Sequence, residues 1–390
     1  MSARRELLDV AGIHRVVVKL GSSSLTSPRR GLREEVIGEV AEQVATLVGT
    51  RGLAFVVVSS GAVASGRKML GLTGRPSLAQ KQAAAAVGQP ALMEAWSRAL
   101  GRRGLLTGQV LMTHEDFTDR RRYVNAKNTF ETLLASGIVP IVNENDTVAT
   151  AEIRLGDNDH LAVLVANLVG ADLLVLMTDS DGMFSADPHK NPDAVRVSVL
   201  DRVDEDALSR ARGTRAGSPG SGGMSTKLHA ARLAASLGVP VVITRGDVDG
   251  RLEEVLAGED VGTLVVPSTG VRPTGRKLWI ASAGRPRGTL TVDDGAARVL
   301  RDQGRSLLPA GITAVSGDFC SGDVVTILDP EGRPVGRGVT GWPAIEVARA
   351  MGRRTADLGD LAERGLVPEV VHRDDLTLAS REDDSKGDSR

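Results

Sequence analysis

The sequence predicts an α/β protein: a three-layer first domain, in which helices cover a mainly parallel central sheet, and a small, mostly β second domain. Two observations predict this. Over about the first 250 residues, short apolar runs rich in Val, Ile and Leu alternate with longer helical stretches, as in a parallel sheet covered by helices. From 258 to 275 a passage rich in Gly, Pro and Thr ends the alternation, and shorter strand-like runs follow.

The elements expected in the first domain alternate along the chain. Strands with the turns that follow them are expected at 14–20, 53–61, 105–113, 138–146, 172–182 and 239–246. Helices are expected at 32–49, 78–99, 123–136, 158–168 and 224–237. In open α/β sheets ligands bind beyond the carboxyl ends of the strands, so the residues that follow each apolar run are the candidates for a site.

The longest near-apolar stretch runs from Leu161 to Met177. Asn167, Gly170 and Asp172 interrupt it, and it is shorter than the roughly 20 residues that a membrane-spanning helix needs. We therefore interpret it as a helix, a turn and a buried strand, and expect no membrane association.

The length of 390 residues exceeds the usual span of one domain. We predict a first domain over 1–270, a second over 271–355 with short strands such as GTLTVDD, ITAVSG, DVVTIL and PVGRGVT, and a C-terminal segment over 356–390. From about Leu376 the chain is charged and serine-rich without apolar periodicity, which predicts a disordered tail.

Charge and cysteine content limit the classes of function. A formal net charge of −1 gives no global field for nucleic acid or membranes, so an anionic substrate must be held by locally placed cations and backbone amides. The single cysteine, Cys320, excludes an intrachain disulfide framework and a multi-cysteine metal site. The N-terminus lacks the apolar stretch of a signal peptide, so we expect a cytoplasmic protein.

The first candidate site is VVVKLGSSSLT, in which a buried strand brings Lys19 to a turn containing Gly21 and three serines. A lysine beside a glycine- and hydroxyl-rich turn suits phosphate binding through charge, backbone N–H groups and hydroxyls. The segment is not a P-loop, because G-x-x-x-x-G-K-[ST] is absent. A surface lysine at a strand end is the alternative.

Two further candidates would suit recognition of a small zwitterion. Ser60 ends a strand and precedes a helix whose free N–H groups can hold a carboxylate, although it could equally be a plain N-cap. Amides and carboxylates then cluster beside apolar runs at 143–146 and 157–159, as expected for binding an amino acid. Asx turns and helix capping are the alternative for this cluster.

Two segments are candidates for a nucleotide site. A buried strand ends in Thr178 and Asp179, where a ribose or base could lie, although a surface turn would look similar. The segment GSPGSGGMSTK places mobile backbone amides before a helix that carries Lys227 in its first turns, and this combination suits a phosphate clamp. A flexible linker before a helix is the alternative.

These motifs, taken in order over residues 14–250, closely resemble the amino acid kinase family, and within it the members that phosphorylate the side-chain carboxylate of glutamate. The region from about Lys277 to Met351 resembles the PUA domain that such bacterial kinases carry. The resemblance implies ATP as co-substrate with Mg²⁺, L-glutamate as acceptor and the first step of proline biosynthesis. It also implies a homo-oligomer and feedback inhibition by proline.

The resemblance also implies roles for individual residues, carried over motif by motif. Lys19 and Lys227 would bind the transferring phosphate, with Asp159 holding both lysines in position. Ser60, Asp146 and Asn158 would contact glutamate, and Thr178 and Asp179 would lie at the nucleotide. The segment that would close over ATP consists of Ser221, Gly222, Gly223, Met224, Ser225, Thr226 and Lys227; Ser221 departs from the family's threonine but keeps the hydroxyl. No residue is assigned as a metal ligand.

The chemistry of this transfer needs no general base. A glutamate side chain has a reference pKa of about 4.3 and is already ionised at neutral pH. The difficulty is to bring an anionic nucleophile to a polyanionic triphosphate, so catalysis should consist of in-line positioning and charge neutralisation. Lys19 and Lys227 suit that need, and Mg²⁺ should be carried by the ATP phosphates.

Two alternatives remain open from the sequence. One is a kinase of the same family that acts on another acceptor, because the choice of substrate depends on pocket shape. The other is RNA binding through the second domain, where residues 272–354 contain 13 basic and 8 acidic residues. Few large aromatic side chains accompany them and they form no dense run, which favours a solvated charged face.

Overall fold

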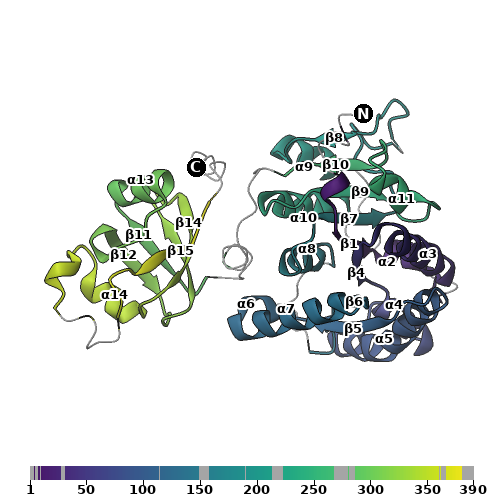
Figure 1. Cartoon of the computed structure of the whole chain (residues 1–390), viewed down its shortest axis with the longest axis horizontal. Helices are drawn as coiled ribbons and strands as arrows, with labels where there is room; N and C mark the ends of the chain where they lie inside the picture. The colour runs from purple at the N-terminus through teal and green to yellow at the C-terminus, as the bar shows by residue number, and fades with distance from the viewer. Residues whose placement is uncertain are drawn as a thin grey trace. The chain divides into compact units, whose positions relative to one another are not determined.

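The computed structural model describes residues 4, 8, 10–27, 31–113, 115–148, 158–188, 190–212, 223–267, 280, 286–359, 361 and 366–379. The chain divides into two compact units, Met1–Arg272 and Pro273–Arg390 (Figure 1). Within the ranges given, no helix is both long enough and apolar enough to cross a membrane.

The first unit is built on an eight-stranded sheet with the strand order β5-β6-β4-β1-β7-β9-β10-β8. Its strands are β1 (Arg15–Leu20), β4 (Ala54–Ser59), β5 (Thr107–Met112), β6 (Val139–Glu144), β7 (Leu173–Thr178), β8 (Val199–Leu200), β9 (Val241–Arg245) and β10 (Thr263–Val265). All neighbouring strands pair in parallel except β9 and β10, which pair antiparallel. The predicted mainly parallel sheet is confirmed.

Helices cover both faces of this sheet, with α3 and α11 on one side and α8 and α10 on the other (Figure 1). The helices and short strands of the unit are η1 (Val10–Gly12), α2 (Ser22–Leu25), β2 (Thr26–Ser27), β3 (Gly31–Leu32), α3 (Glu34–Arg51), α4 (Ala62–Met69), α5 (Leu78–Gly101), α6 (Glu115–Thr118), α7 (Arg120–Ala135), α8 (Asn158–Leu168), α9 (Glu205–Arg212), α10 (Met224–Ser236) and α11 (Arg251–Leu256). The five predicted helices agree with α3, α5, α7, α8 and α10 to within three residues at each end.

The central strands are apolar on both faces because helices bury both. Alternate residues of β1, Val16, Val18 and Leu20, belong to one core cluster with Val40 and Val44 of α3. The residues between them point to the opposite face, as the two-residue period of a strand requires. The near-continuous apolar runs of the sequence therefore follow from a parallel sheet with two covered faces.

Helices α4 and α5 touch backbone to backbone. A Cβ atom on Gly66 would lie 1.8 Å from the carbonyl oxygen of Ala84, and one on Gly88 would lie 1.9 Å from that of Ala62. Any side chain at either glycine would therefore push the helices apart. This contact brings the middle of α5 close to the turn that follows β4.

The second unit contains a five-stranded sheet with the order β12-β11-β13-β14-β15, in which only β11 and β13 pair in parallel. Its elements are β11 (Gly288–Val292), α13 (Asp294–Gln303), η2 (Pro309–Gly311), β12 (Ile312–Gly317), β13 (Val324–Leu328), β14 (Pro334–Thr340), α14 (Ala344–Ala350), η3 (Thr355–Asp357) and β15 (Val371–Leu378). A separate apolar cluster around Trp342 fills this unit. The mostly β second domain is confirmed.

The prediction of a disordered tail from about Leu376 is wrong at its beginning. Strand β15 (Val371–Leu378) pairs antiparallel with β14, and Leu376 is buried in the core of the second unit. The run of charged residues from His372 to Asp375 hides this strand in the sequence, because an edge strand exposes most of its side chains. The remainder of the predicted tail, residues 380–390, lies outside the described part of the chain.

Candidate active site

Three neighbouring strands, β4, β1 and β7, place their carboxyl ends side by side in the middle of the sheet. Lys19 is the penultimate residue of β1, opposite Val58 of β4 and Leu176 of β7. Of the sequence candidates, Ser60 directly follows β4 and Thr178 is the last residue of β7. The parallel topology therefore brings three separate motifs to one edge of the sheet, where ligands bind in such folds.

A buried triad of charges forms the centre of the site. Asp159, in the first turn of α8, lies 2.5 Å from the Nζ atom of Lys19 through Oδ1 and 3.1 Å from that of Lys227 through Oδ2. The exposed fractions of the three side chains are 1% for the aspartate and 2% and 5% for the two lysines. One carboxylate thus fixes two cations that lie far apart in the sequence.

The electrostatics of the triad keep the aspartate ionised. Burial alone would raise the pKa of Asp159, but the charges and hydrogen bonds of Lys19 and Lys227 outweigh burial and hold the pKa below its ordinary value. At neutral pH the three groups therefore carry one positive charge in total. Inside a protein such a charge acts on an anionic ligand more strongly than it would in water.

A chain of amide and hydroxyl groups runs beside the triad. The Nδ2 atom of Asn158 donates to the Oγ atom of Ser60 at 2.6 Å and to the Oδ1 atom of Asn143 at 3.0 Å. Asn143 in turn donates through Nδ2 to the Oε1 atom of Gln89 at 2.9 Å. Two of the residues implied for glutamate, Ser60 and Asn158, are therefore in direct contact.

Sequence reasoning missed Gln89. It lies within the alanine-rich helix α5, between Ala85 and Leu92, which are both buried and lie on the same helix face. A polar residue at a helical spacing from apolar core residues is the signal that could have identified it. Asn143, by contrast, belongs to the polar cluster that the sequence did indicate.

Two helices near the triad begin at glycines rather than at capping side chains. The N-cap residues are Gly61 for α4 and Gly223 for α10, and neither provides a side-chain hydrogen bond to its helix. Gly61 adopts a φ of 117°, a region that other residues rarely enter. The first N–H groups of such helices are available to an anion.

The remaining candidates lie at or near this edge of the first unit. Thr178 is buried and donates to the Oδ1 atom of the exposed Asp179 at 3.0 Å. Thr226 lies in the first turn of α10 and donates to Asp159 Oδ2 at 3.4 Å. Asp146 is half-buried in the turn after β6, and Met224 and Ser225 are half-buried at the start of α10. Ser221 and Gly222 lie outside the described residues.

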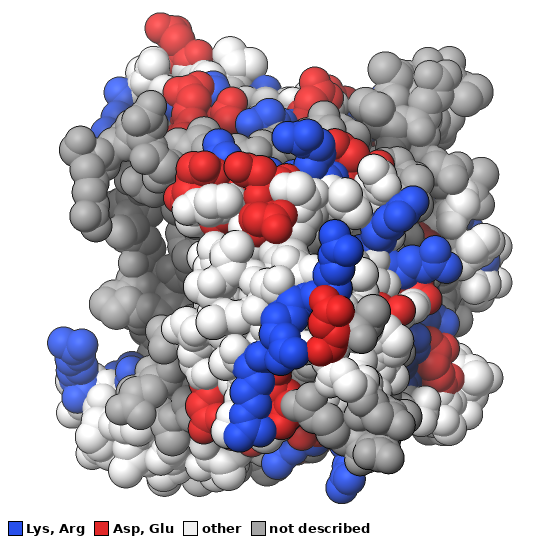
Figure 2. All heavy atoms as spheres, turned by 90° about the vertical axis from the view of Figure 1, so that its left-hand side faces the viewer, with Lys and Arg blue, Asp and Glu red and all other residues white. Residues whose placement is uncertain are grey.

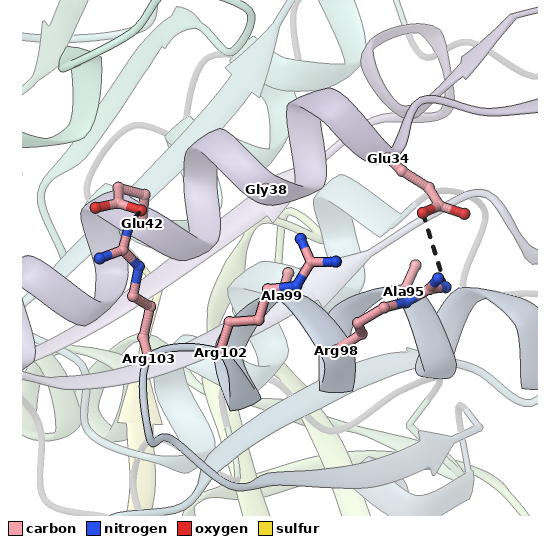
Figure 3. A pocket seen from close by; sticks show the side chains of 8 residues that line it. All are labelled: Glu34, Gly38, Glu42, Ala95, Arg98, Ala99, Arg102 and Arg103. Atoms are coloured by element: carbon pink, nitrogen blue, oxygen red, sulfur yellow. Dashed lines mark hydrogen bonds and ion pairs between the residues drawn. The ribbon is translucent and has the colours of Figure 1, made fainter.

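A groove of about 370 Å³ lies elsewhere in the first unit, between α3 and α5. Glu34 and Glu42 on α3 face Arg98 on α5 and Arg103 just after the end of α5, and each acid pairs with one arginine (Figure 3). None of the residues described above lines this groove. In the ranges that the structure describes, no three His, Cys, Asp or Glu side chains are grouped so that they could hold a metal ion.

Comparison with known proteins finds two family models that match parts of this chain and relatives that align with it over almost their full length. The model of the amino acid kinase family matches residues 14–245, and that of the PUA domain matches residues 288–360. Proteins named glutamate 5-kinase from Pseudomonas paraeruginosa and Pseudomonas aeruginosa are each 48% identical to it. One from Stutzerimonas stutzeri is 47% identical. Each alignment covers 95% of this chain and 99% of the relative.

Solved structures also resemble part of the chain. An isopentenyl phosphate kinase from T. acidophilum aligns with 64% of this chain and 99% of its own, at 18% identity and a TM-score of 0.45. A UMP kinase from Bacillus anthracis aligns with 66% of this chain and 97% of its own, at 16% identity and a TM-score of 0.46.

Proposed function

We propose, because this chain belongs to the amino acid kinase family, a transfer reaction. The γ-phosphoryl group of ATP is transferred to the side-chain carboxylate of L-glutamate. The product, L-glutamyl 5-phosphate, is formed in the first step of proline biosynthesis. The relatives named glutamate 5-kinase, which align over 95% of this chain, identify the substrate. Within the structure, the buried pairing of Lys19 and Lys227 with Asp159 is the observation that carries the reaction type.

The reaction requires two anions to approach each other. The side-chain carboxylate of glutamate attacks the γ-phosphorus in its ionised form, the bond between that phosphorus and the bridging oxygen breaks, and ADP leaves. Lys19 and Lys227 are the cations at the site, and they would neutralise the charge on the transferring group. Asp159 holds both ammonium groups in place, so they need no reorganisation as the charge develops.

Ser60, Asp146 and Asn158 are our proposed contacts for glutamate. The support is geometric for two of them, because the Asn158 amide and the Ser60 hydroxyl lie 2.6 Å apart beside the triad. Asp146 lies in the turn after β6, two residues beyond its last residue, Glu144. A carboxylate at that position would suit the substrate ammonium group.

We assign the nucleotide to the neighbouring part of the same edge. Thr178 and Asp179 would contact it, and the segment from Ser221 to Lys227 would close over the phosphates, with the uncapped start of α10 among its donors. Mg²⁺ would arrive bound to the phosphates. The fit is with phosphate-carried metal rather than a protein cage, because the buried carboxylate of the triad, Asp159, already holds two lysines.

Several further properties belong to the proposal. We assign catalysis to residues 1–270 and an accessory role to residues 271–355, with 356–390 as the C-terminal segment. We expect a homo-oligomer that proline inhibits, as the family resemblance implies, and a cytoplasmic location, as the single cysteine and the N-terminal sequence indicate.

RNA binding through the second unit is less well supported than catalysis. Arg301 and Arg333 pair with Asp329, and Arg349 pairs with Glu346. Figure 2 shows a short diagonal band of basic side chains with acidic side chains beside and above it. Nucleic acid binding depends on basic side chains that are available to phosphates, and pairing with acids weakens the attraction between these side chains and phosphates.

The test is ATP- and Mg²⁺-dependent formation of γ-glutamyl hydroxamate from the purified full chain, glutamate and hydroxylamine. Aspartate, acetylglutamate and carbamate are assayed beside it. A signal selective for glutamate is the expected result. Turnover with another acceptor would keep the family and overturn the substrate, and absence of turnover together with tight RNA binding would favour the nucleic-acid alternative.

A further inference from the structure

We propose that Gln89 is a positioning residue for the acceptor amino acid, because it anchors the hydrogen-bond chain that ends at Asn158 and Ser60. It belongs to α5, and the middle of this helix lies close to the turn that follows β4. The inference rests on the proposed function, since it concerns how the glutamate subsite is oriented.

The chain joins four elements of the fold. Gln89 comes from α5, Asn143 from β6, Asn158 from the start of α8 and Ser60 from the turn after β4. The successive distances are 2.9, 3.0 and 2.6 Å. Gln89, Asn143 and Ser60 are buried and Asn158 is half-buried, so the bond between Gln89 and Asn143 is shielded from water.

Each amide in such a chain has a donor end and an acceptor end, so the chain can run in two directions. In the observed direction, Asn158 uses its Nδ2 group to donate to both Ser60 and Asn143. Its Oδ1 atom then remains as an acceptor and the Ser60 hydroxyl hydrogen remains as a donor. An acceptor beside a donor matches an amino acid, which has an ammonium group and carboxylates.

In the reversed direction, the same residues would present different groups. The Ser60 hydroxyl would donate to Asn158 Oδ1, and Asn143 would donate to the same oxygen, so the amide nitrogen of Asn158 would face the ligand instead. The acceptor for the ammonium group would be lost. Gln89 supports the observed direction, because its Oε1 atom accepts from Asn143 Nδ2 and holds that side chain in place beside Asn158.

The amide nitrogen of Gln89 indicates that this residue does not serve to stabilise the fold. Its Nε2 atom is buried and has no hydrogen-bond partner in the part of the chain that the structure describes. A buried donor without an acceptor lowers the stability of the fold. An apolar residue of similar length would avoid that loss, so a glutamine here is explained by what its oxygen does for Asn143.

The first test is Gln89→Met in the full-length protein, which keeps length and volume but removes the acceptor. We expect the KM for glutamate to rise by about tenfold, with kcat and the KM for ATP within about twofold of wild type, since the change affects binding of one substrate. The melting temperature should hardly change, because one unsatisfied buried amide at residue 89 is exchanged for another at Asn143.

Gln43→Met is the matched control. Gln43 is also buried, on α3, and its Oε1 atom accepts from the backbone N–H of Leu252 at 2.7 Å, away from the hydrogen-bond chain of Gln89. The same chemical change there should lower the melting temperature and leave the KM for glutamate unaltered. An equal rise in KM in both variants would show that the effect is general loosening and would overturn the proposal.

Gln89→Glu tests the direction itself. In its ionised form the new side chain accepts but does not donate, so it can hold Asn143 only in the observed orientation. We expect a KM for glutamate within about threefold of wild type, whereas a KM as high as that of Gln89→Met would overturn the assigned direction. If Gln89→Met does not fold, Gln89→Asn replaces it as the test. The shorter side chain cannot reach Asn143, so the KM for glutamate should rise in the same way.

The outcomes separate this inference from the proposed function. A wild-type protein that forms no hydroxamate from glutamate refutes the function. An active wild-type protein whose KM for glutamate is unchanged by Gln89→Met and Gln89→Asn refutes the role of Gln89 alone.

Discussion

Two buried aspartates, one in each unit, each hold two cationic side chains. Asp159 in the first unit and Asp329 in the second have side chains that are 1% and 2% exposed. The partners of Asp159 are lysines that are themselves buried, whereas those of Asp329 are arginines with exposed fractions of 29% and 41%. The same combination of charges therefore lies in two very different environments.

The difference lies in where the partners come from. Asp329 also accepts from the backbone N–H of Arg333 at 2.8 Å, four residues away, and so closes the turn between β13 and β14. The two partners of Asp159 are 140 and 68 residues away in sequence, calculated from their positions at 19 and 227. A local cluster stabilises a turn, whereas a cluster gathered from three distant motifs at the carboxyl edge of a sheet holds charge ready for a ligand.

The largest effect that would sharpen this comparison is on activity. Lys227→Ala should lower kcat by about a thousandfold and raise the KM for glutamate much less, because the charge is most useful on the transferring phosphoryl group. Lys190→Ala is the control, since that lysine is 73% exposed. Steady-state kinetics measure both variants, and an unchanged kcat for Lys227→Ala would remove this lysine from the mechanism.

The next effect is on stability of the first unit. Asp159→Asn preserves shape but leaves two buried lysines without their carboxylate, which should lower the free energy of unfolding by about 3–5 kcal/mol. Activity should fall as well, because neither ammonium group is then held in position. Urea unfolding measures the first quantity, and a variant as stable as wild type would show that the triad is solvated rather than buried.

The corresponding change in the second unit should be smaller. Asp329→Asn should cost about 1–2 kcal/mol, because both arginines can turn toward water and the amide can still accept a hydrogen bond in the turn. Hydroxamate formation should retain the wild-type kcat. A loss of activity comparable to that of Asp159→Asn would contradict the purely local role of Asp329 and link the second unit to catalysis.

The smallest effect is the dependence of stability on pH. The pKa of Asp159 is lowered in the folded protein, so its contribution is fully present above the unfolded value of 3.8 and is lost as the pH falls through the folded value. The stability difference between wild type and Asp159→Asn should therefore be constant above about pH 5 and shrink below pH 3.8. Urea unfolding at several pH values tests this, and a difference that grows on acidification would contradict the sign.

Much of the first unit could be predicted because its elements are periodic over long stretches. The helix predicted at 158–168 has the bounds of α8, because Asn158 is a residue that begins helices, Gly170 is one that ends them, and the run between them is apolar. Strand β15 was missed because edge strands expose charged side chains and lose the apolar alternation. Its place in the sheet depends on pairing with β14, which no local pattern records.

The residues at the site divide in the same way. Lys19, Ser60, Asn158, Asp159 and Lys227 could be selected from the sequence, because each stands beside a strand end or a helix start, and turn and capping chemistry is local. That Asp159 holds both lysines was expected only through the family resemblance, and the distances come from the tertiary structure. That Gln89 lies at the end of the amide chain was decided by the tertiary structure alone. The physical reason is that ion pairs and hydrogen bonds act over a few ångströms in space, and only the order of the parallel strands brings residues so distant in sequence within that range.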